Sequence, residues 1–326
     1  MTDGKIEEYG RLAQEGDAEA LYDLADCYYY GDGVEQDRRK AIELYREAAD
    51  AGEARGLFRL AECFLYGDGV ERNEAGAAKL YREAADEGLP EALIRLAECY
   101  RDGDGVEQNK EEAFRLFKEA ADEGLPEALI PLAECYFYGD GVETDEKEAV
   151  KRYREAVEEG WTNALVPLAE CYYHGDGVEQ DKEEAVRLYR EAVDNGWTNA
   201  LTPLAHCYFY GDGVKTDKEK GFKLYKEAAE EGYTDIFQQL GDCYFYGDGV
   251  KEDKKEAFKL YKKAVECGWT TALIRMADCY FYGDGVKQNS KKAFKLYKEA
   301  AEEGWPEAQE ALAEKFGCSS DPEEEK

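Results

Sequence analysis

The amino-acid sequence predicts an all-α fold: a right-handed α/α superhelical solenoid of eight 36-residue helical hairpins with a half-repeat cap at each end. Two observations predict it. The tetrapeptide Gly-Asp-Gly-Val occurs eight times, from Gly31 to Gly283, always 36 residues apart and without insertion or deletion. A cysteine ladder beginning at Cys27 and a glycine ladder beginning at Gly52 keep the same interval. Such a fixed period is typical of stacked arrays in which each repeat contacts only its neighbours.

The first half of each repeat predicts an amphipathic helix, here called helix A. Positions are counted from Ala20, which is position 1 of the first repeat. In the fifth repeat, positions 1, 2, 5, 9 and 12 lie on one stripe of a helix with 3.6 residues per turn: Ala164, Leu165, Leu168, Tyr172 and Gly175. The two glycines of Gly-Asp-Gly-Val then end this helix.

The second half of each repeat predicts a second helix, helix B. Position 18 is Asp or Asn in every repeat, and in the fifth repeat Asp181 is followed three residues later by Glu184, which is the pattern of a capping box. Helix B is expected to bury Ala185, Leu188, Tyr189, Ala192 and Val193. It is expected to end at Gly196, where a left-handed residue is favoured.

The domain organisation follows from this repeat. Residues 1–19 are expected to form an N-terminal capping helix, residues 20–307 the eight repeats, and residues 308–326 a C-terminal capping helix and an acidic tail. The prediction is one long domain.

The repeat resembles a known family. Its pattern is small-x-x-x-Leu-small-x-x-Tyr-x-x-Gly-x-Gly-Val, then Asp, then Ala-x-x-x-Tyr-x-x-Ala-x-x-x-Gly, and over residues 5–316 it resembles the Sel-one-like repeat (SLR), a relative of the tetratricopeptide repeat. The resemblance implies A helices that line a concave groove, and an adaptor that binds other proteins without catalysis. Position 6, usually Gly in that family, is Gly here only at Gly241. The cysteine pairing of secreted cysteine-rich relatives is also absent.

The charge balance excludes several functional classes. The chain has 75 acidic and 42 basic residues, a net charge of −33, which disfavours binding to nucleic acid or to anionic membranes. No apolar stretch approaches the roughly 20 residues of a membrane span, and the first residues lack the pattern of a signal peptide. We expect a cytoplasmic monomer with reduced, packed cysteines. The charge is concentrated in residues 1–199, with 50 acidic and 23 basic residues, so a basic end of a partner is expected toward the N-terminal repeats.

The groove face of helix A is predicted to carry the binding site. Positions 3, 7, 10 and 11 point away from helix B. Position 7 is acidic in every repeat except at His206, and positions 10 and 11 are mostly aromatic. Carboxylates flanked by aromatic rings favour an extended partner segment with basic or aromatic side chains. The alternative is that the rings pack along the inner wall of a tight superhelix.

Repeats 4 to 6 differ from the others. Position 4 becomes Pro131, Pro167 and Pro203, and both histidines of the chain lie in these repeats. The prolines free backbone carbonyls beside the groove, or else change only the local pitch. The predicted partner-binding residues are Asn163, Asn199, Glu134, Glu170, His206, Tyr138, Tyr173, His174, Phe209 and Tyr210.

Other chemistry is not indicated. The sequence contains no catalytic motif and no cofactor-binding loop. No metal site is expected either, because the side chains of Cys171, His174, His206 and Cys207 do not converge. A site for a C-terminal carboxylate needs groove arginines, which are Arg59, Arg95, Arg101 and Arg275, so such a site is expected only around the third repeat and not at repeats 5 and 6. A structural or idealised repeat scaffold without a groove ligand is the alternative function.

Overall fold

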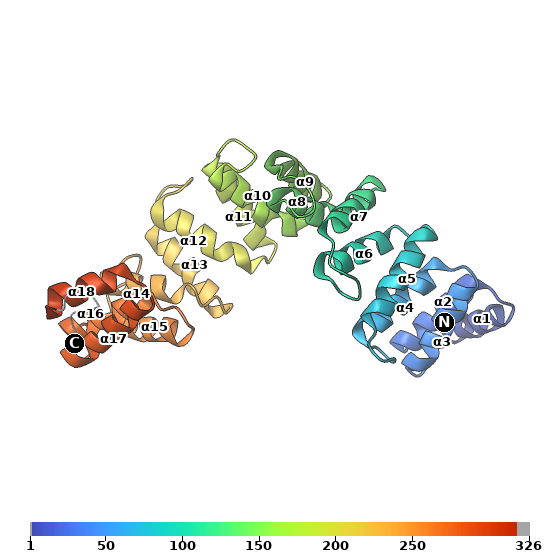
Figure 1. Ribbon diagram of the computed structural model, residues 1–326, viewed down its shortest axis with the longest axis horizontal. Helices are drawn as coiled ribbons and strands as arrows, with labels where there is room; N and C mark the ends of the chain where they lie inside the picture. The colour runs from blue at the N-terminus through green and yellow to red at the C-terminus, as the bar shows by residue number, and fades with distance from the viewer. Residues whose placement is uncertain (1, 318–326) are drawn as a thin grey trace. The chain divides into compact units, whose positions relative to one another are not determined.

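The computed structural model describes residues 2–317, and these residues contain helices and no strand (Figure 1). The predicted acidic tail lies mostly outside the described residues. The α-helices are α1 (Thr2–Gln14), α2 (Ala18–Tyr30), α3 (Arg38–Asp50), α4 (Ala54–Tyr66), α5 (Glu74–Asp86), α6 (Glu91–Asp102), α7 (Lys110–Asp122), α8 (Leu129–Tyr138), α9 (Glu146–Glu158), α10 (Leu165–His174), α11 (Lys182–Asp194), α12 (Leu201–Tyr210), α13 (Lys218–Glu230), α14 (Phe237–Tyr246), α15 (Lys254–Glu266), α16 (Ala272–Tyr282), α17 (Ser290–Glu302) and α18 (Pro306–Phe316).

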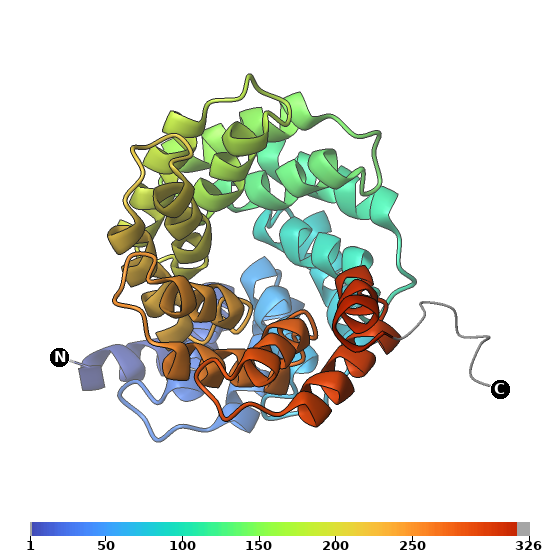
Figure 2. The ribbon, with the colours of Figure 1, turned by 90° about the vertical axis from the view of Figure 1, so that its left-hand side faces the viewer.

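Two compact units make up the chain. The N-terminal unit runs to Ala164 and includes Asp176–Val178, and the C-terminal unit contains Leu165–Gly175 and the residues from Glu179 on. Within each unit the even-numbered helices from α2 to α16 are the A helices, and each packs against the B helix that follows it. In Figure 2 the hairpins of repeats 7 and 8, orange to red, lie side by side. The all-α solenoid class predicted from the sequence is confirmed.

Helix boundaries follow the predicted capping residues. The side chain of Asp181 accepts a hydrogen bond of 3.0 Å from the backbone N–H of Glu184 at the start of α11. Helix α12 ends at Gly211, whose φ is 84° and whose N–H donates to the carbonyl of Cys207. These contacts satisfy backbone groups that a helix end leaves unpaired.

Repeats 4 to 6 begin helix A differently. A single 3₁₀ turn, Pro126–Ala128, Thr162–Ala164 or Thr198–Ala200, precedes an α-helix of 10 residues, whereas the A helices of repeats 1 and 2 have 13. Pro131, Pro167 and Pro203 are each the third residue of the α-helix that follows. Proline is tolerated there because the first turn has few backbone donors with an intrahelical acceptor.

The core of each hairpin combines small and large side chains. Helix B buries alanines and one aromatic ring, such as Ala185 and Tyr189 in α11, against Leu168, Ala169 and Cys171 of α10. Small residues at fixed positions let the helices approach closely and leave a slot for the ring. Within residues 2–317 no helix is both long and apolar enough to cross a membrane.

A seam joins each repeat to the next. In the C-terminal unit Gly213, with φ of 65°, lies so close to α11 that an added Cβ would be 2.0 Å from the carbonyl oxygen of Lys182. The neighbouring Asp212 forms a 2.7 Å ion pair with the Lys182 ammonium. The same contact pairs a basic residue at position 19 with the turn aspartate of the next repeat in Arg38–Asp68, Lys110–Asp140, Lys218–Asp248 and Lys254–Asp284.

The seam predicts a large difference between two glycine substitutions. Gly196→Ala places a Cβ in open space and costs only the left-handed conformation, about 1–2 kcal/mol. Gly213→Ala adds a clash with the backbone of α11, so we expect a further loss of about 1–3 kcal/mol. The midpoint of urea-induced unfolding measures both. Equal midpoints for the two variants would contradict a tight seam.

Candidate functional site

The carboxylate at position 7 is neutralised by the chain itself in the first repeats. Asp26 of α2 accepts a hydrogen bond from the buried hydroxyl of Tyr45 in α3. Arg59, at position 4 of the next A helix, lies 3.6 Å from Asp26 and 2.7 Å from Glu62. Its guanidinium also lies over the ring of Tyr30, 5.4 Å from the centroid. One arginine therefore satisfies two position-7 acids and stacks on a position-11 ring.

The last repeats use the same arrangement. Asp242 of α14 accepts a 2.7 Å hydrogen bond from Tyr261 and pairs with Arg275, again a position-4 arginine, at 3.3 Å. Asp278 of α16 accepts from Tyr297 and pairs with Lys315 of α18 at 2.5 Å. These contacts leave neither carboxylate without a cation.

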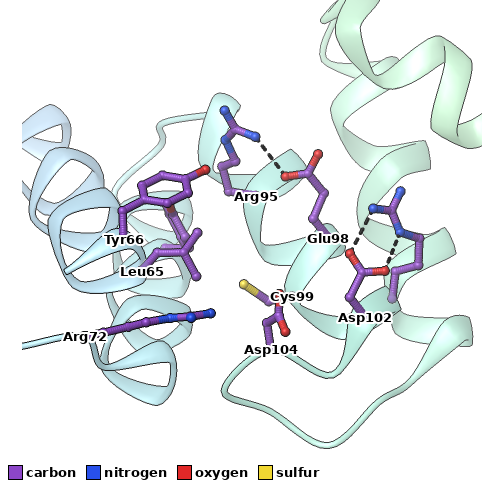
Figure 3. Close-up of a pocket in the computed structure, with 10 residues that line it drawn as sticks. Leu65, Tyr66, Arg72, Arg95, Glu98, Cys99, Asp102 and Asp104 are labelled. Carbon is purple, nitrogen blue, oxygen red and sulfur yellow. Dashed lines mark hydrogen bonds and ion pairs between the residues drawn. The ribbon is translucent and has the colours of Figure 1, made fainter. Parts of the chain in front are cut away.

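A pocket of about 450 Å³ lies between repeats 2 and 3, and its groove arginines, Arg95 and Arg101, form ion pairs with acidic residues of the chain (Figure 3). Arg95 pairs with Glu98 at 2.9 Å, and Arg101 pairs with Asp102 at 2.9 Å. The ring of Tyr66 lines the same pocket. Each of the groove arginines near the third repeat therefore has an acidic partner within the chain.

Glu134 and Glu170 differ from these carboxylates. Within the described residues 2–317 neither has an ion pair or a hydrogen bond, and both are exposed. Pro203 replaces arginine at position 4 of the A helix next to Glu170 in the C-terminal unit. Partial desolvation raises the pKa of both carboxyl groups.

A pocket of about 390 Å³ brings five of the predicted binding residues together in the C-terminal unit. They are Glu170, Tyr173, His174, Asn199 and His206. Sequence reasoning missed Tyr189, Thr202, Tyr225, Ile236 and Gln239, which line the same pocket. The sequence could have indicated Thr202, because it is a polar residue at position 3, which is aromatic or aliphatic in most other repeats.

The aromatic columns divide into packed and exposed rings. Tyr173, at position 10, is half-buried and donates a 2.9 Å hydrogen bond to Asp212, and Phe209 packs on Tyr225 with centroids 5.8 Å apart. Tyr138 and Tyr210, at position 11, expose 69% and 59% of their surfaces. These two position-10 rings are therefore part of the packing, whereas the two position-11 rings are presented to solvent. Phe209 and Tyr210 line a second pocket, of about 280 Å³, with Asp242.

The predicted asparagines lie in the 3₁₀ turns that start the A helices. Asn163 belongs to the N-terminal unit and Asn199 to the C-terminal unit, and both are exposed. Farther along the chain, hydrogen bonds join the loops that precede α14, α16 and α18: Trp269 Nε1 donates to Thr234 Oγ1 at 3.2 Å, and Trp305 Nε1 donates to Thr270 Oγ1 at 3.1 Å. The Trp-Thr pattern thus joins consecutive loops.

The two histidines border the pocket but do not form a metal centre. Desolvation lowers the pKa of His206, which favours the neutral imidazole, whereas nearby Asp212 opposes that shift. Residues 2–317 contain no group of three or more His, Cys, Asp or Glu side chains that could hold a metal ion.

The regular cysteines are part of the packing. None of the nine cysteines in residues 2–317 forms a disulfide bond, and those at position 8 are buried from Cys63 to Cys279. Burial raises the pKa of the Cys207 thiol to about 11 and that of Cys243 to about 12. Cys267 of the loop after α15 is exposed.

These differences predict selective labelling of the thiols. At pH 8 iodoacetamide should alkylate Cys267 at least about tenfold faster than any position-8 cysteine, because thiolate and access are both required. Peptide mapping by mass spectrometry of a Cys318→Ser variant measures the rates. In urea the rates should converge, and fast labelling of Cys207 in the folded protein would contradict the buried column.

The fold defines a class: a repeat protein built from helical hairpins. The Sel1 repeat family profile matches residues 18–53, 54–89, 90–125, 126–161, 164–197, 199–233, 238–269 and 270–305. The chain belongs to the Sel1 repeat family, as its resemblance to the SLR pattern predicted. Proteins of this family in general mediate protein–protein interactions and are in general non-catalytic.

Solved structures agree with this assignment. Protein c5321, a protective antigen of uropathogenic Escherichia coli strains that displays an SLR fold, is 29% identical over 96% of this chain and 67% of its own, with a TM-score of 0.86. A Sel1 repeat protein from Oxalobacter formigenes is 27% identical over 94% of this chain and 88% of its own, with a TM-score of 0.69. A tetratricopeptide-repeat STAND protein from Pyrococcus horikoshii, 18% identical over 90% of this chain and 48% of its own with a TM-score of 0.52, shares the fold alone. No curated protein matches the chain.

Proposed function

We propose that this protein is a non-catalytic adaptor that binds an extended segment of a partner protein on the groove face of its A helices, with a preference for basic and aromatic side chains. The observation that carries the proposal is the contrast along position 7. Asp26, Asp242 and Asp278 are each paired with a basic residue of the chain, whereas Glu134 and Glu170 are not.

The chain's own cations illustrate the mode of recognition. Lys315 pairs with Asp278 and lies 5.1 Å from the centroid of the Tyr282 ring, so one cation contacts a position-7 acid and a position-11 ring together. A carboxylate between aromatic rings attracts a cation by charge and by the quadrupole of the ring. The residues proposed to bind the partner in the same way are Glu134, Tyr138, Glu170, Tyr173, His174, His206, Phe209 and Tyr210.

Asn163 and Asn199 are proposed to bind the backbone of the partner. Their side chains are exposed in the turns that start two A helices, and an amide offers both a donor and an acceptor. An extended peptide needs such partners, because its own backbone groups are unpaired.

A peptide array tests the proposal. Basic and aromatic 12-residue peptides should bind the full chain more tightly than acidic ones, and Glu170→Gln should weaken the binding of basic peptides by about tenfold through loss of a charge-assisted contact. Glu230→Gln is the matched control, because Glu230 lies on the outer helix α13 and loses only an exposed pair with Lys226.

The array also separates the alternatives. A preference for acidic peptides, or binding that is unaffected by changing Asn199 and His206 together, would contradict the proposed site. Failure of all peptides to bind would favour a structural scaffold without a groove ligand.

A further inference from the structure

We infer that the pocket between repeats 5 and 6 receives the guanidinium group of a partner's arginine, in the place that the chain's own Arg59 fills between repeats 1 and 2. This inference rests on the proposed function and names the chemistry of its site.

The two places share a position-7 acid and a position-10 tyrosine, but His174 replaces Tyr30, and His206 replaces Glu62, which is the acid closer to Arg59. Arg59 lies among Asp26, Tyr29, Tyr30 and Glu62, which occupy positions 7, 10 and 11 of repeat 1 and position 7 of repeat 2. The equivalent residues in repeats 5 and 6 are Glu170, Tyr173, His174 and His206, and all four line the 390 Å³ pocket. Pro203 stands at the position of Arg59 and lines the pocket as well.

Two hydroxyl groups of the pocket lining have no hydrogen-bond partner among the described residues, and the buried Tyr81 hydroxyl of repeat 2 likewise has none. Tyr45 and Tyr261 each donate their hydroxyl to the position-7 acid of their own repeat. Tyr189, at the same position in repeat 5, exposes only 2% of its surface and lines the pocket, yet its hydroxyl has no hydrogen bond among the described residues. Thr202 Oγ1, also in the pocket lining, is buried without a hydrogen-bond partner.

A guanidinium suits this set better than an ammonium. The pocket offers oxygen acceptors from Glu170, Tyr189 and Asn199, and a guanidinium has five donors and no acceptor. Its flat faces also stack on rings such as those of Tyr173 and His174. Position 4 is arginine at Arg59, Arg95 and Arg275 and never lysine, so the repeat itself is adapted to this group.

The two histidines allow a direct test on the full chain. They are the only histidines in the sequence, and both line the pocket, so their imidazole proton NMR signals report on it alone. N-acetyl-arginine amide should shift both signals in a saturable way at pH 7.5 and 0.15 M salt. N-acetyl-citrulline amide, which has the same shape without the charge, should bind at least about tenfold more weakly, and N-acetyl-lysine amide should lie between them.

Pro203→Arg supplies the missing group from within the chain. The new side chain should pair with Glu170, shift the histidine signals without added ligand and abolish the response to N-acetyl-arginine amide. Pro131→Arg is the matched control, because the preceding position-7 acid, Glu98, is already paired with Arg95. It should leave the histidine response unchanged. Circular dichroism checks that both variants keep their helices, and Glu170→Gln, which should also abolish the response, provides a second variant.

The outcomes separate this inference from the proposed function. Equal binding of the arginine and citrulline probes, no shift with either, or an unchanged response in both Pro203→Arg and Glu170→Gln would overturn the arginine pocket. Basic or aromatic peptides that still bind the array would then leave the adaptor function standing. A selective arginine response without binding of any longer peptide would support the pocket and contradict the extended groove.

Discussion

The approach of each Gly-Asp-Gly turn to the preceding B helix is the constraint on which the repeat depends. The turn glycine lies against the first residue of that helix, as Gly213 does against Lys182, and the adjacent aspartate pairs with the same lysine. An inserted residue in the turn would move both groups at once. This explains why the 36-residue period contains no insertion or deletion although the groove residues vary.

A rigid seam leaves the groove face free to vary. Packing within each hairpin depends on alanines and one buried ring of helix B, whereas positions 4, 7 and 11 of helix A contribute less to it. The position-4 arginine shows how these positions interact. Where arginine is present, as at Arg275, it pairs with the acid of the preceding repeat. Where proline replaces it, as at Pro203, the acid Glu170 has no such cation within the described residues.

The fold was predictable because its signals are local and repeated eight times. A capping aspartate, a terminating glycine and an apolar stripe each act within one turn of helix, and the prediction of helix B in the fifth repeat agrees with α11 (Lys182–Asp194). The site was only partly predictable, since it depends on distances between repeats. The position of Glu170 on the groove follows from helical periodicity, but its lack of a partner depends on residue 203, which is 33 positions away. The bond from Tyr173 to Asp212 is likewise non-local, and it fixes the position of a ring that also lines the pocket.

The choice of proline at position 4 has a physical consequence that alanine would not have. Either residue removes the guanidinium, but proline also has no N–H, so a 3₁₀ turn comes before it and the residue preceding position 1 falls within that turn. Asn199 occupies this place and lines the same pocket as Glu170. Proline at position 203 therefore removes the internal arginine. In the same repeat, the Asn199 amide lies at the edge of the space that this arginine would fill. Packing alone requires neither the proline nor the asparagine, because repeats 1 and 2 pack by the same seam with Arg59 at position 4 of repeat 2.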